Sequence, residues 1–121
     1  MLLRNKNAIV YGAGAIGRAV ALGFAREGAK VHLASRGPER MDALGPHGIR
    51  VVGVKTGGVP ESVPEDFAGR DALVEMLVEP TMLGRAATLE DVGNVTAFAA
   101  SDRAASITGA EMNITCGAIM D

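Results

Sequence analysis

Residues 8–30 read AIVYGAGAIG RAVALGFAREGAK, and this stretch decides the fold. The apolar run before the glycines predicts a buried strand at 8–11, and apolar residues recurring every four positions predict a helix over 15–27. Gly28 is placed to end that helix, and KVHLA at 30–34 predicts a second strand. A strand, a glycine turn, a helix and a second strand form one unit of an α/β fold with a parallel sheet.

The glycines of this turn have the spacing GxGxxG, which is a candidate phosphate cradle. Gly12 permits the tight turn, Gly14 permits close approach of a pyrophosphate, and Gly17 lets the helix pack on the strand. With Ile16 they lie at a helix N-terminus, where free N–H groups and the helix dipole favour an anion. The chain has sixteen glycines, so the motif alone is weak, and a plain strand-to-helix turn is the alternative.

The end of the second strand indicates which dinucleotide fits. An NAD site places an Asp or Glu there for the ribose 2′-OH, whereas this chain has Ser35 and Arg36. The Arg36 guanidinium is suited to a 2′-phosphate, and the Ser35 hydroxyl adds a donor. The sequence therefore favours NADP(H) over NAD, with a solvated loop arginine as the alternative.

The rest of the chain continues the alternation of helices and strands. Further elements are expected at Pro38–Leu44 (helix), 49–54 (strand), 65–79 (helix), 88–100 (helix opened by a capping box from Thr88 to Asp91) and 111–114 (strand). This pattern predicts a single α/β domain over 1–121, a Rossmann-like three-layer parallel sheet truncated to about four strands. The expected strand order is 2-1-3-4, which puts the glycine turn at the topological switch point.

Composition excludes several other classes of protein. The net charge of −2 without a basic stripe argues against nucleic-acid binding, and no apolar run approaches the length of a membrane span. The opening MLLRNKN is unlike a signal peptide, and the single cysteine, Cys116, rules out an internal disulfide. A cytoplasmic protein is expected.

Three stretches together carry a family resemblance. YGAGAIGRAVALGFAREGAKVHLASR at 11–36, GIRVVGVKTGGVPES at 48–62 and GRAATLEDVGNVTAFAASDRAASITGAEMNITCG at 84–117 are similar to short-chain dehydrogenase/reductases. The resemblance implies reversible carbonyl–alcohol hydride transfer with a nicotinamide dinucleotide. It also implies that the loop of Gly57, Gly58 and Val59 approaches the nicotinamide, and that the last helix and strand lie at subunit contacts of an oligomer.

The resemblance has a gap between Leu44 and Gly48. The family places there its central strands, its catalytic Ser and its Tyr-x-x-x-Lys pair, and this chain has only Tyr11, followed four residues later by Ala15. The chain thus looks like an internally deleted member with no catalytic residues of its own, and little or no activity is expected. The glycine turn also looks one residue short, and Thr56 replaces a usual proline.

The deletion leaves several possibilities open. The third strand pairs with the first to give the order 2-1-3-4, or two intertwined chains fill each other's gap, because exposed strand edges favour pairing. A self-associating structural remnant without a nucleotide ligand is the alternative to a dinucleotide-binding protein. A third possibility is a partner chain that supplies the missing Tyr and Lys.

The remaining polar and apolar candidates have plainer interpretations. His32 reads as structural and His47 as solvated, and neither forms a zinc site with Cys116, which reads as an inert thiol. The resemblance implies that Met76, Leu77 and Met82 belong to a lid over the substrate site. The favoured alternative is that these side chains only cover the hydrophobic core. The acidic pairs at predicted helix starts read as caps: Glu65, Asp66, Glu90 and Asp91.

Overall fold

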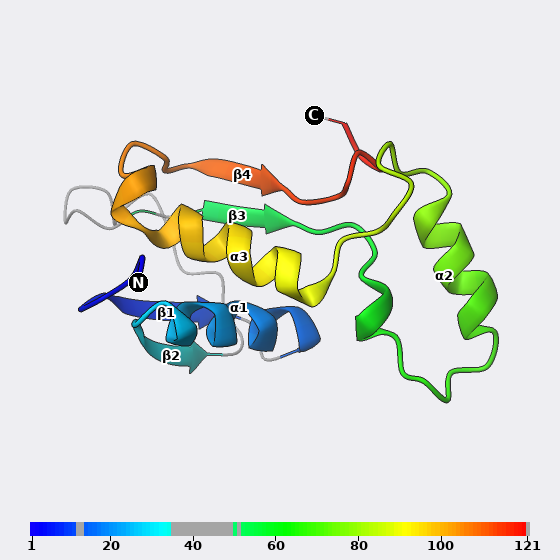
Figure 1. Ribbon diagram of the computed structural model, residues 1–121, viewed down its shortest axis with the longest axis horizontal. Helices are drawn as coiled ribbons and strands as arrows, with labels where there is room; N and C mark the ends of the chain where they lie inside the picture. The colour runs from blue at the N-terminus through cyan, green and yellow to red at the C-terminus, as the bar shows by residue number, and fades with distance from the viewer. Residues whose placement is uncertain (12–13, 35–49, 51, 121) are drawn as a thin grey trace.

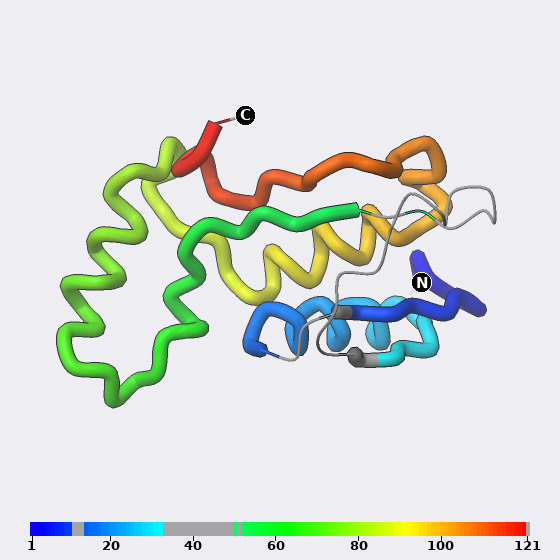
Figure 2. Tube along the Cα trace, turned by 180° about the vertical axis from the view of Figure 1, so that it is seen from behind, coloured from blue at the N-terminus to red at the C-terminus, as the bar shows by residue number. Residues whose placement is uncertain are grey.

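The computed structural model describes residues 1–11, 14–34, 50 and 52–120. Two strand–helix units lie side by side, and a smaller helix stands at one end of the molecule (Figure 1). Seen from behind, the N-terminal half lies beside the longer C-terminal half, which extends past it at the end that carries α2 (Figure 2). The predicted helix at Pro38–Leu44 falls outside the described residues.

The N-terminal half follows the sequence prediction closely. Strand β1 (Asn7–Tyr11) leads into helix α1 (Ala15–Arg26) and strand β2 (Lys30–Ala34), and the two strands pair in parallel. Gly28 adopts φ +91° and its N–H donates to the Ala25 carbonyl, which confirms its role in ending α1.

The C-terminal half contributes a second pair of parallel strands. Strand β3 (Val52–Lys55) pairs in parallel with β4 (Ala110–Asn113). An ion pair links the two strands, with Lys55 Nζ 3.4 Å from Glu111 Oε2. Between them helix α3 (Leu89–Ala100) opens at the predicted capping box and packs back along the sheet.

The two halves meet where α1 crosses α3. A Cβ on Gly23 would lie 2.8 Å from the Gly93 carbonyl oxygen, so the helices touch backbone to backbone. The buried cluster next to this crossing joins residues of both halves: Leu3, Val10, Phe24 and Ala97. Lys6 adds a 2.7 Å ion pair with Asp102 at the rim.

The strand order differs from the prediction in one respect. The expected pairs β1–β2 and β3–β4 are both present and parallel, but among the described residues β3 does not hydrogen-bond to β1. Over the described ranges the strands therefore form two two-stranded sheets in place of one sheet of order 2-1-3-4. Arg50 provides a reason, because its guanidinium donates to the carbonyls of Ala99, Ser101 and Ile107 and holds the start of β3 toward α3 and β4.

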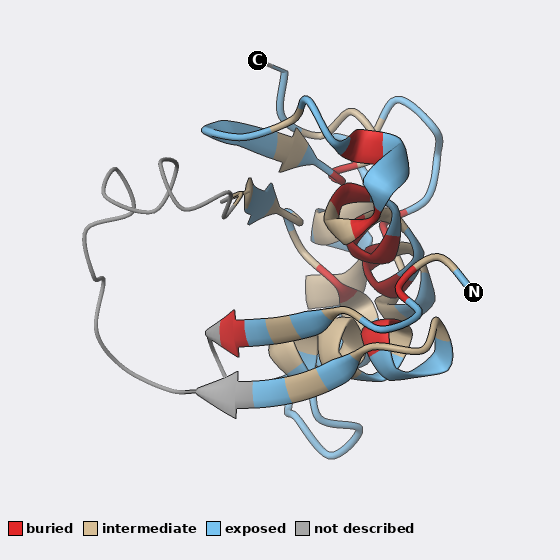
Figure 3. Ribbon diagram, turned by 90° about the vertical axis from the view of Figure 1, so that its left-hand side faces the viewer, coloured by how far each residue is buried: buried red, intermediate tan, exposed pale blue. Residues whose placement is uncertain are grey.

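Two of the three expected layers are present in the described residues. Helices α1 and α3 lie on one face of both sheets (Figure 3). On β1, Val10 is buried whereas Ile9 is 61% exposed, as the alternation of a strand with one covered face requires. The chain is a truncated Rossmann-like α/β fold. None of the described helices has the length and apolar character needed to cross a membrane.

The predicted helix at 65–79 begins five residues later than expected. Helix α2 (Arg70–Val78) starts after Gly69, whose φ of +81° breaks any helical path from the preceding residues. A short 3₁₀ helix, Pro60–Ser62, follows β3 instead. The acidic pair Glu65 and Asp66 therefore lies before the helix and does not cap it.

Candidate functional site

The carboxyl ends of the strands converge on one end of the molecule. All four strands point in the same direction, and α1 and α3 both begin at the end where the strands finish (Figure 1). The described part of the glycine turn follows β1 there, and Gly57 to Val59 follow β3 at the same end. Open α/β folds bind their ligands at this edge.

Gly14 provides the part of the cradle that the structure describes. It is the N-cap of α1 with φ −71° and ψ −174°, makes no side-chain cap, and is followed by no acidic residue in the first turn. A Cβ on Gly14 would meet nothing within 4 Å among the described residues, so this position has room beside it in that part of the chain. An open, uncapped helix N-terminus fits a pyrophosphate. Ile16 and Gly17 lie half-buried in this first turn.

The loop after β3 is built on glycine for steric reasons. Gly57 has φ +60°, and a Cβ on it would lie 3.5 Å from the Thr115 side chain. A Cβ on Gly58 would overlap the Leu77 side chain, while Val59 is buried and anchors the loop. Only the backbone of Gly57 and Gly58 is available at the strand ends, as close approach of a ligand would need.

A polar network behind this loop was not singled out from the sequence. Thr115 is 3% exposed, and its hydroxyl lies 2.7 Å from the Asn113 amide oxygen, which also accepts the Thr115 N–H. The Asn113 amide nitrogen donates to the Ile119 carbonyl at 2.8 Å. Asn113 and Thr115, two residues before Gly117, are residue types that favour such a turn and were the available signal.

The N-terminus of α3 is the most strongly stabilised helix start at this edge. The Thr88 hydroxyl accepts from the Asp91 N–H, and the Asp91 carboxylate accepts from the Thr88 N–H and, at 2.6 Å, from Arg85. The Arg85 hydrogen bond, followed by the Thr88 N–H, lowers the pKa of Asp91 to about 2. Glu61 accepts from the Leu89 N–H at 2.5 Å. The sequence indicated the capping box, but not Arg85 or Glu61.

Three predicted site residues lie outside the described residues, namely Gly12, Ser35 and Arg36, and so does His47, which the sequence predicts to be solvated. Their contacts therefore stay predictions. His32 is exposed on β2, and Cys116 is a half-buried free thiol with φ +54°. In the described ranges no three His, Cys, Asp or Glu side chains gather as a metal site would need.

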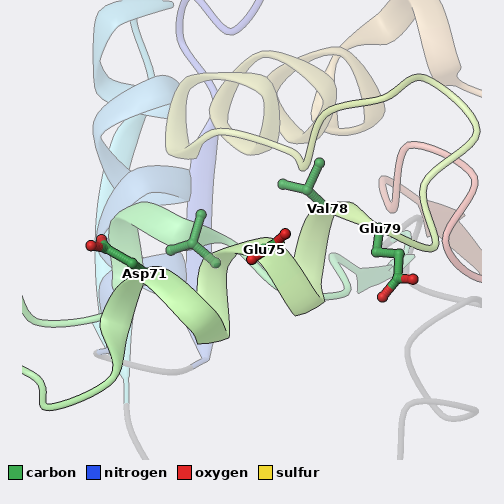
Figure 4. Close-up of a pocket in the computed structure, with 5 residues that line it drawn as sticks. Asp71, Glu75, Val78 and Glu79 are labelled. Carbon is green, nitrogen blue, oxygen red and sulfur yellow. The ribbon is translucent and has the colours of Figure 1, made fainter.

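A groove along α2 has the wrong chemistry for a dinucleotide. It is lined from α2 alone, by Asp71, Val74, Glu75, Val78 and Glu79 (Figure 4). Three carboxylates at four-residue spacing lie on this side of the helix, and their charge would repel a pyrophosphate. The strand-end edge is therefore the better candidate site.

Two protein-family models match the sequence. The model described as enoyl-(acyl carrier protein) reductase matches residues 41–118, nearly two-thirds of the chain. The model described as NADP oxidoreductase, coenzyme F420-dependent, matches residues 6–65, which include the glycine turn. No curated protein is significantly similar in sequence.

Solved structures share the fold at low sequence identity. The enoyl-[acyl-carrier-protein] reductase (NADH) of Aquifex aeolicus aligns over 99% of each chain, with a TM-score of 0.74 and 15% identity. The enoyl-(acyl-carrier-protein) reductase of Anaplasma phagocytophilum, in complex with NAD, aligns over 98% of this chain and 95% of its own. Its TM-score is 0.77 and its sequence identity is 12%. A putative short-chain alcohol dehydrogenase from Sinorhizobium meliloti aligns over 96% of this chain and 97% of its own, with a TM-score of 0.75 and 14% sequence identity.

Proposed function

Because this chain belongs to the enoyl-(acyl carrier protein) reductase family of short-chain dehydrogenase/reductases, we propose that it binds NADP(H) at the strand-end edge. The open, uncapped N-terminus of α1 at Gly14 is the observation that carries the proposal. The α1 N-terminus and Gly12, Gly14 and Gly17 hold the pyrophosphate, and Gly57 to Val59 approach the nicotinamide.

The preference for NADP(H) rests on the residues after β2. Ser35 and Arg36 stand where an NAD site carries an acid, and Arg36 offers a two-pronged donor to a 2′-phosphate. The family model matching 6–65 is described as an NADP oxidoreductase, which supports the same cofactor. One matched reductase structure holds NAD, so NADH belongs in the test as a competing ligand.

The reaction that we propose from the resemblance to short-chain dehydrogenase/reductases is the interconversion of a carbonyl and an alcohol, for which a bound nicotinamide would exchange the hydride with the substrate carbon. The protein's share of that reaction is to orient the cofactor and supply a proton at the substrate oxygen. This chain has no Tyr-x-x-x-Lys pair, so it can orient a cofactor but has no positioned proton donor of the family type. We propose that the isolated chain binds dinucleotide and turns over little or none, and that it is cytoplasmic.

Calorimetric titration of the full chain with NADPH and NADH tests the proposal. In Gly14→Ala the added Cβ has open space in the protein, so stability should stay within about 0.5 kcal/mol of wild type while NADPH affinity falls at least tenfold. Arg36→Glu should weaken NADPH about tenfold or more and NADH little, because only NADPH carries the 2′-phosphate.

The controls separate binding from folding. Each variant's urea unfolding midpoint is measured beside the titration, so that a loss of affinity is credited to the site only in a folded chain. Binding of NADPH weaker than millimolar by wild type contradicts the proposal, as does equal affinity in Gly14→Ala. Measurable ketone reduction abolished by Arg36→Glu would overturn the predicted inactivity.

Self-association is the second candidate, favoured by the sheet face that no described helix covers. Ile9 on β1 and Val54 on β3 are 61% and 36% exposed, and each strand has one hydrogen-bonded neighbour in the described residues. Strand edges and apolar sheet faces of this kind favour pairing between chains. We propose a homo-oligomer, with a structural remnant lacking any nucleotide ligand as the alternative function.

A further inference from the structure

Helix α2 carries a row of carboxylates that have no partner. Asp71, Glu75 and Glu79 follow one another at intervals of about one helical turn along its groove (Figure 4). All three residues are exposed, and within the described ranges none of their carboxylates has an ion-pair or hydrogen-bond partner. Like charges four residues apart on a helix repel each other. Cations supplied by another surface would therefore stabilise this row.

The same groove also has an aliphatic side. Val74 and Val78 line it next to the carboxylates, and every residue that lines it belongs to α2. Asp71 and Glu79 are eight residues apart, which is about 12 Å along a helix. A surface that fits this groove therefore has cations about 12 Å apart and an aliphatic side chain between them.

The exposed side of α1 has this pattern. Arg18, Leu22 and Arg26 follow one another at four-residue intervals, all three are exposed, and Leu22 is 58% exposed. Neither guanidinium has an ion-pair or hydrogen-bond partner in the part of the chain that the structure describes. The two arginines are eight residues apart, as Asp71 and Glu79 are, so the basic row and the acidic row have the same length.

The two rows do not meet within one chain. Helix α1 packs on α3 and on the strands β1 and β2, whereas α2 stands at the end of the molecule, away from α1 (Figures 1 and 2). A second copy of the chain provides the complementary row for each of them. Opposite charges that face each other across an interface fix its register and exclude partners of the wrong sign.

We infer that the exposed side of α1 in one copy docks into the groove on α2 of a second copy. Arg18 and Arg26 pair with the carboxylates of the groove, and Leu22 lies on Val74 and Val78. The contact joins two different surfaces, so each chain offers one of each, and the assembly grows or closes into a ring. The inference rests neither on dinucleotide binding nor on the proposed pairing through the sheet face.

Salt separates this contact from apolar pairing through the sheet face. Raising the ionic strength from about 0.1 M to about 1 M shortens the screening length from about 10 Å to about 3 Å, which weakens ion pairs at an exposed interface. Burial of apolar surface is not weakened in this way. Association through α1 and α2 should therefore fall as salt is added.

Charge reversal on each helix tests the contact by analytical ultracentrifugation. Arg18→Glu/Arg26→Glu makes the α1 row acidic, and Glu75→Lys/Glu79→Lys makes most of the α2 row basic. Each double variant alone brings like charges together, so its association constant should fall about tenfold or more. In an equal mixture the acidic α1 of the first variant faces the basic α2 of the second, and association should return.

Matched variants show that the position of the charges matters. Arg4→Glu/Lys30→Glu changes the net charge as much as the α1 reversal does, at exposed positions outside both rows, and should associate as wild type does. Leu22→Lys should also keep the contact, because the lysine stem lies on the valines and its ammonium reaches Glu75. The urea unfolding midpoint of each variant confirms that the chains being compared are folded.

All variants are also made in the Ile9→Lys background, which weakens pairing through the sheet face. Ile9→Lys should retain a salt-sensitive association that the α1 reversal removes. An Ile9→Lys chain that is monomeric at every concentration overturns the inference and leaves the proposed sheet-face pairing standing. Folded reversal variants that associate as wild type does, or a mixture that stays monomeric, also overturn it. NADPH titration of the same proteins measures the proposed dinucleotide site separately.

Discussion

The charge of Asp91 stabilises the start of α3. Its carboxylate accepts from Arg85 and from the Thr88 N–H, and these hydrogen bonds lower its pKa to about 2. Because the unfolded chain has the higher pKa, protonation on acidification favours unfolding. The stabilisation is complete above the unfolded value near 3.8 and is lost as pH falls toward 2.

We therefore expect Asp91→Asn to remove an acid-sensitive part of the stability. The Asp91 side chain is one-third exposed, so screening limits its contribution to about 1 kcal/mol at neutral pH. Urea unfolding at a series of pH values measures it. The variant should be less stable than wild type at pH 7, and the two curves should converge between pH 4 and pH 2. Parallel curves over that window would contradict this account.

At the scale of elements, the crossing of α1 and α3 joins the two halves. Gly23→Ala should destabilise the protein by about 2 kcal/mol, although Ala is the better helix former by about 1 kcal/mol. The reason is that the new Cβ would lie 2.8 Å from the Gly93 carbonyl oxygen and 2.9 Å from Gly93 Cα, and neither backbone atom can rotate away.

Gly93→Ala is the matched control on the opposite helix. Its Cβ would lie 3.2 Å from the Ala19 carbonyl oxygen and 3.7 Å from Gly23 Cα, distances that a small shift relieves. Gly93→Ala should lower the free energy of unfolding clearly less than Gly23→Ala does, in the same thermal or urea unfolding measurement. If the order of the two variants is reversed, the helices do not cross as described.

The elements that the sequence predicted well are those with a local signal at each end. Thr88 and Asp91 mark the start of α3, and Gly28 marks the end of α1. The predicted start of α2 was wrong because the acidic pair Glu65 and Asp66 resembled the first turn of a helix, where acidic residues are common. The backbone at Gly69 decides that boundary, and a glycine's φ is not readable from sequence.

At the scale of the whole molecule, the proposed self-association depends on the sheet face that no described helix covers. We expect the chain to form a dimer or larger oligomer in analytical ultracentrifugation, and Ile9→Lys to shift it toward monomer, because a charge on this face opposes apolar pairing. Ile9 is already 61% exposed, so the variant should fold. Leu22→Lys, at a 58% exposed position of α1, is the control and should associate as wild type does. A monomeric wild type contradicts the proposal.

The class of fold was predicted correctly from the sequence, and the sequence also indicated the strand-end edge at which the candidate site lies. Strand direction and the position of Gly14 and Gly57 depend on local patterns and on the right-handed crossover. The division into two sheets did not follow, because it depends on Arg50, whose three carbonyl partners lie about fifty residues away in the chain. The bracing of Gly57 by Thr115 is likewise a long-range contact.

The seam between the two sheets has a consequence for how this protein tolerates change. Each half carries its own strand pair, its own covering helix and its own share of the strand-end edge. Mechanical or genetic disruption within one sheet breaks no ladder hydrogen bond of the other in the described residues. What joins the halves is the glycine crossing, the buried cluster around it and the Lys6–Asp102 ion pair, so any exchange of one half, in evolution or in the laboratory, has to preserve these contacts.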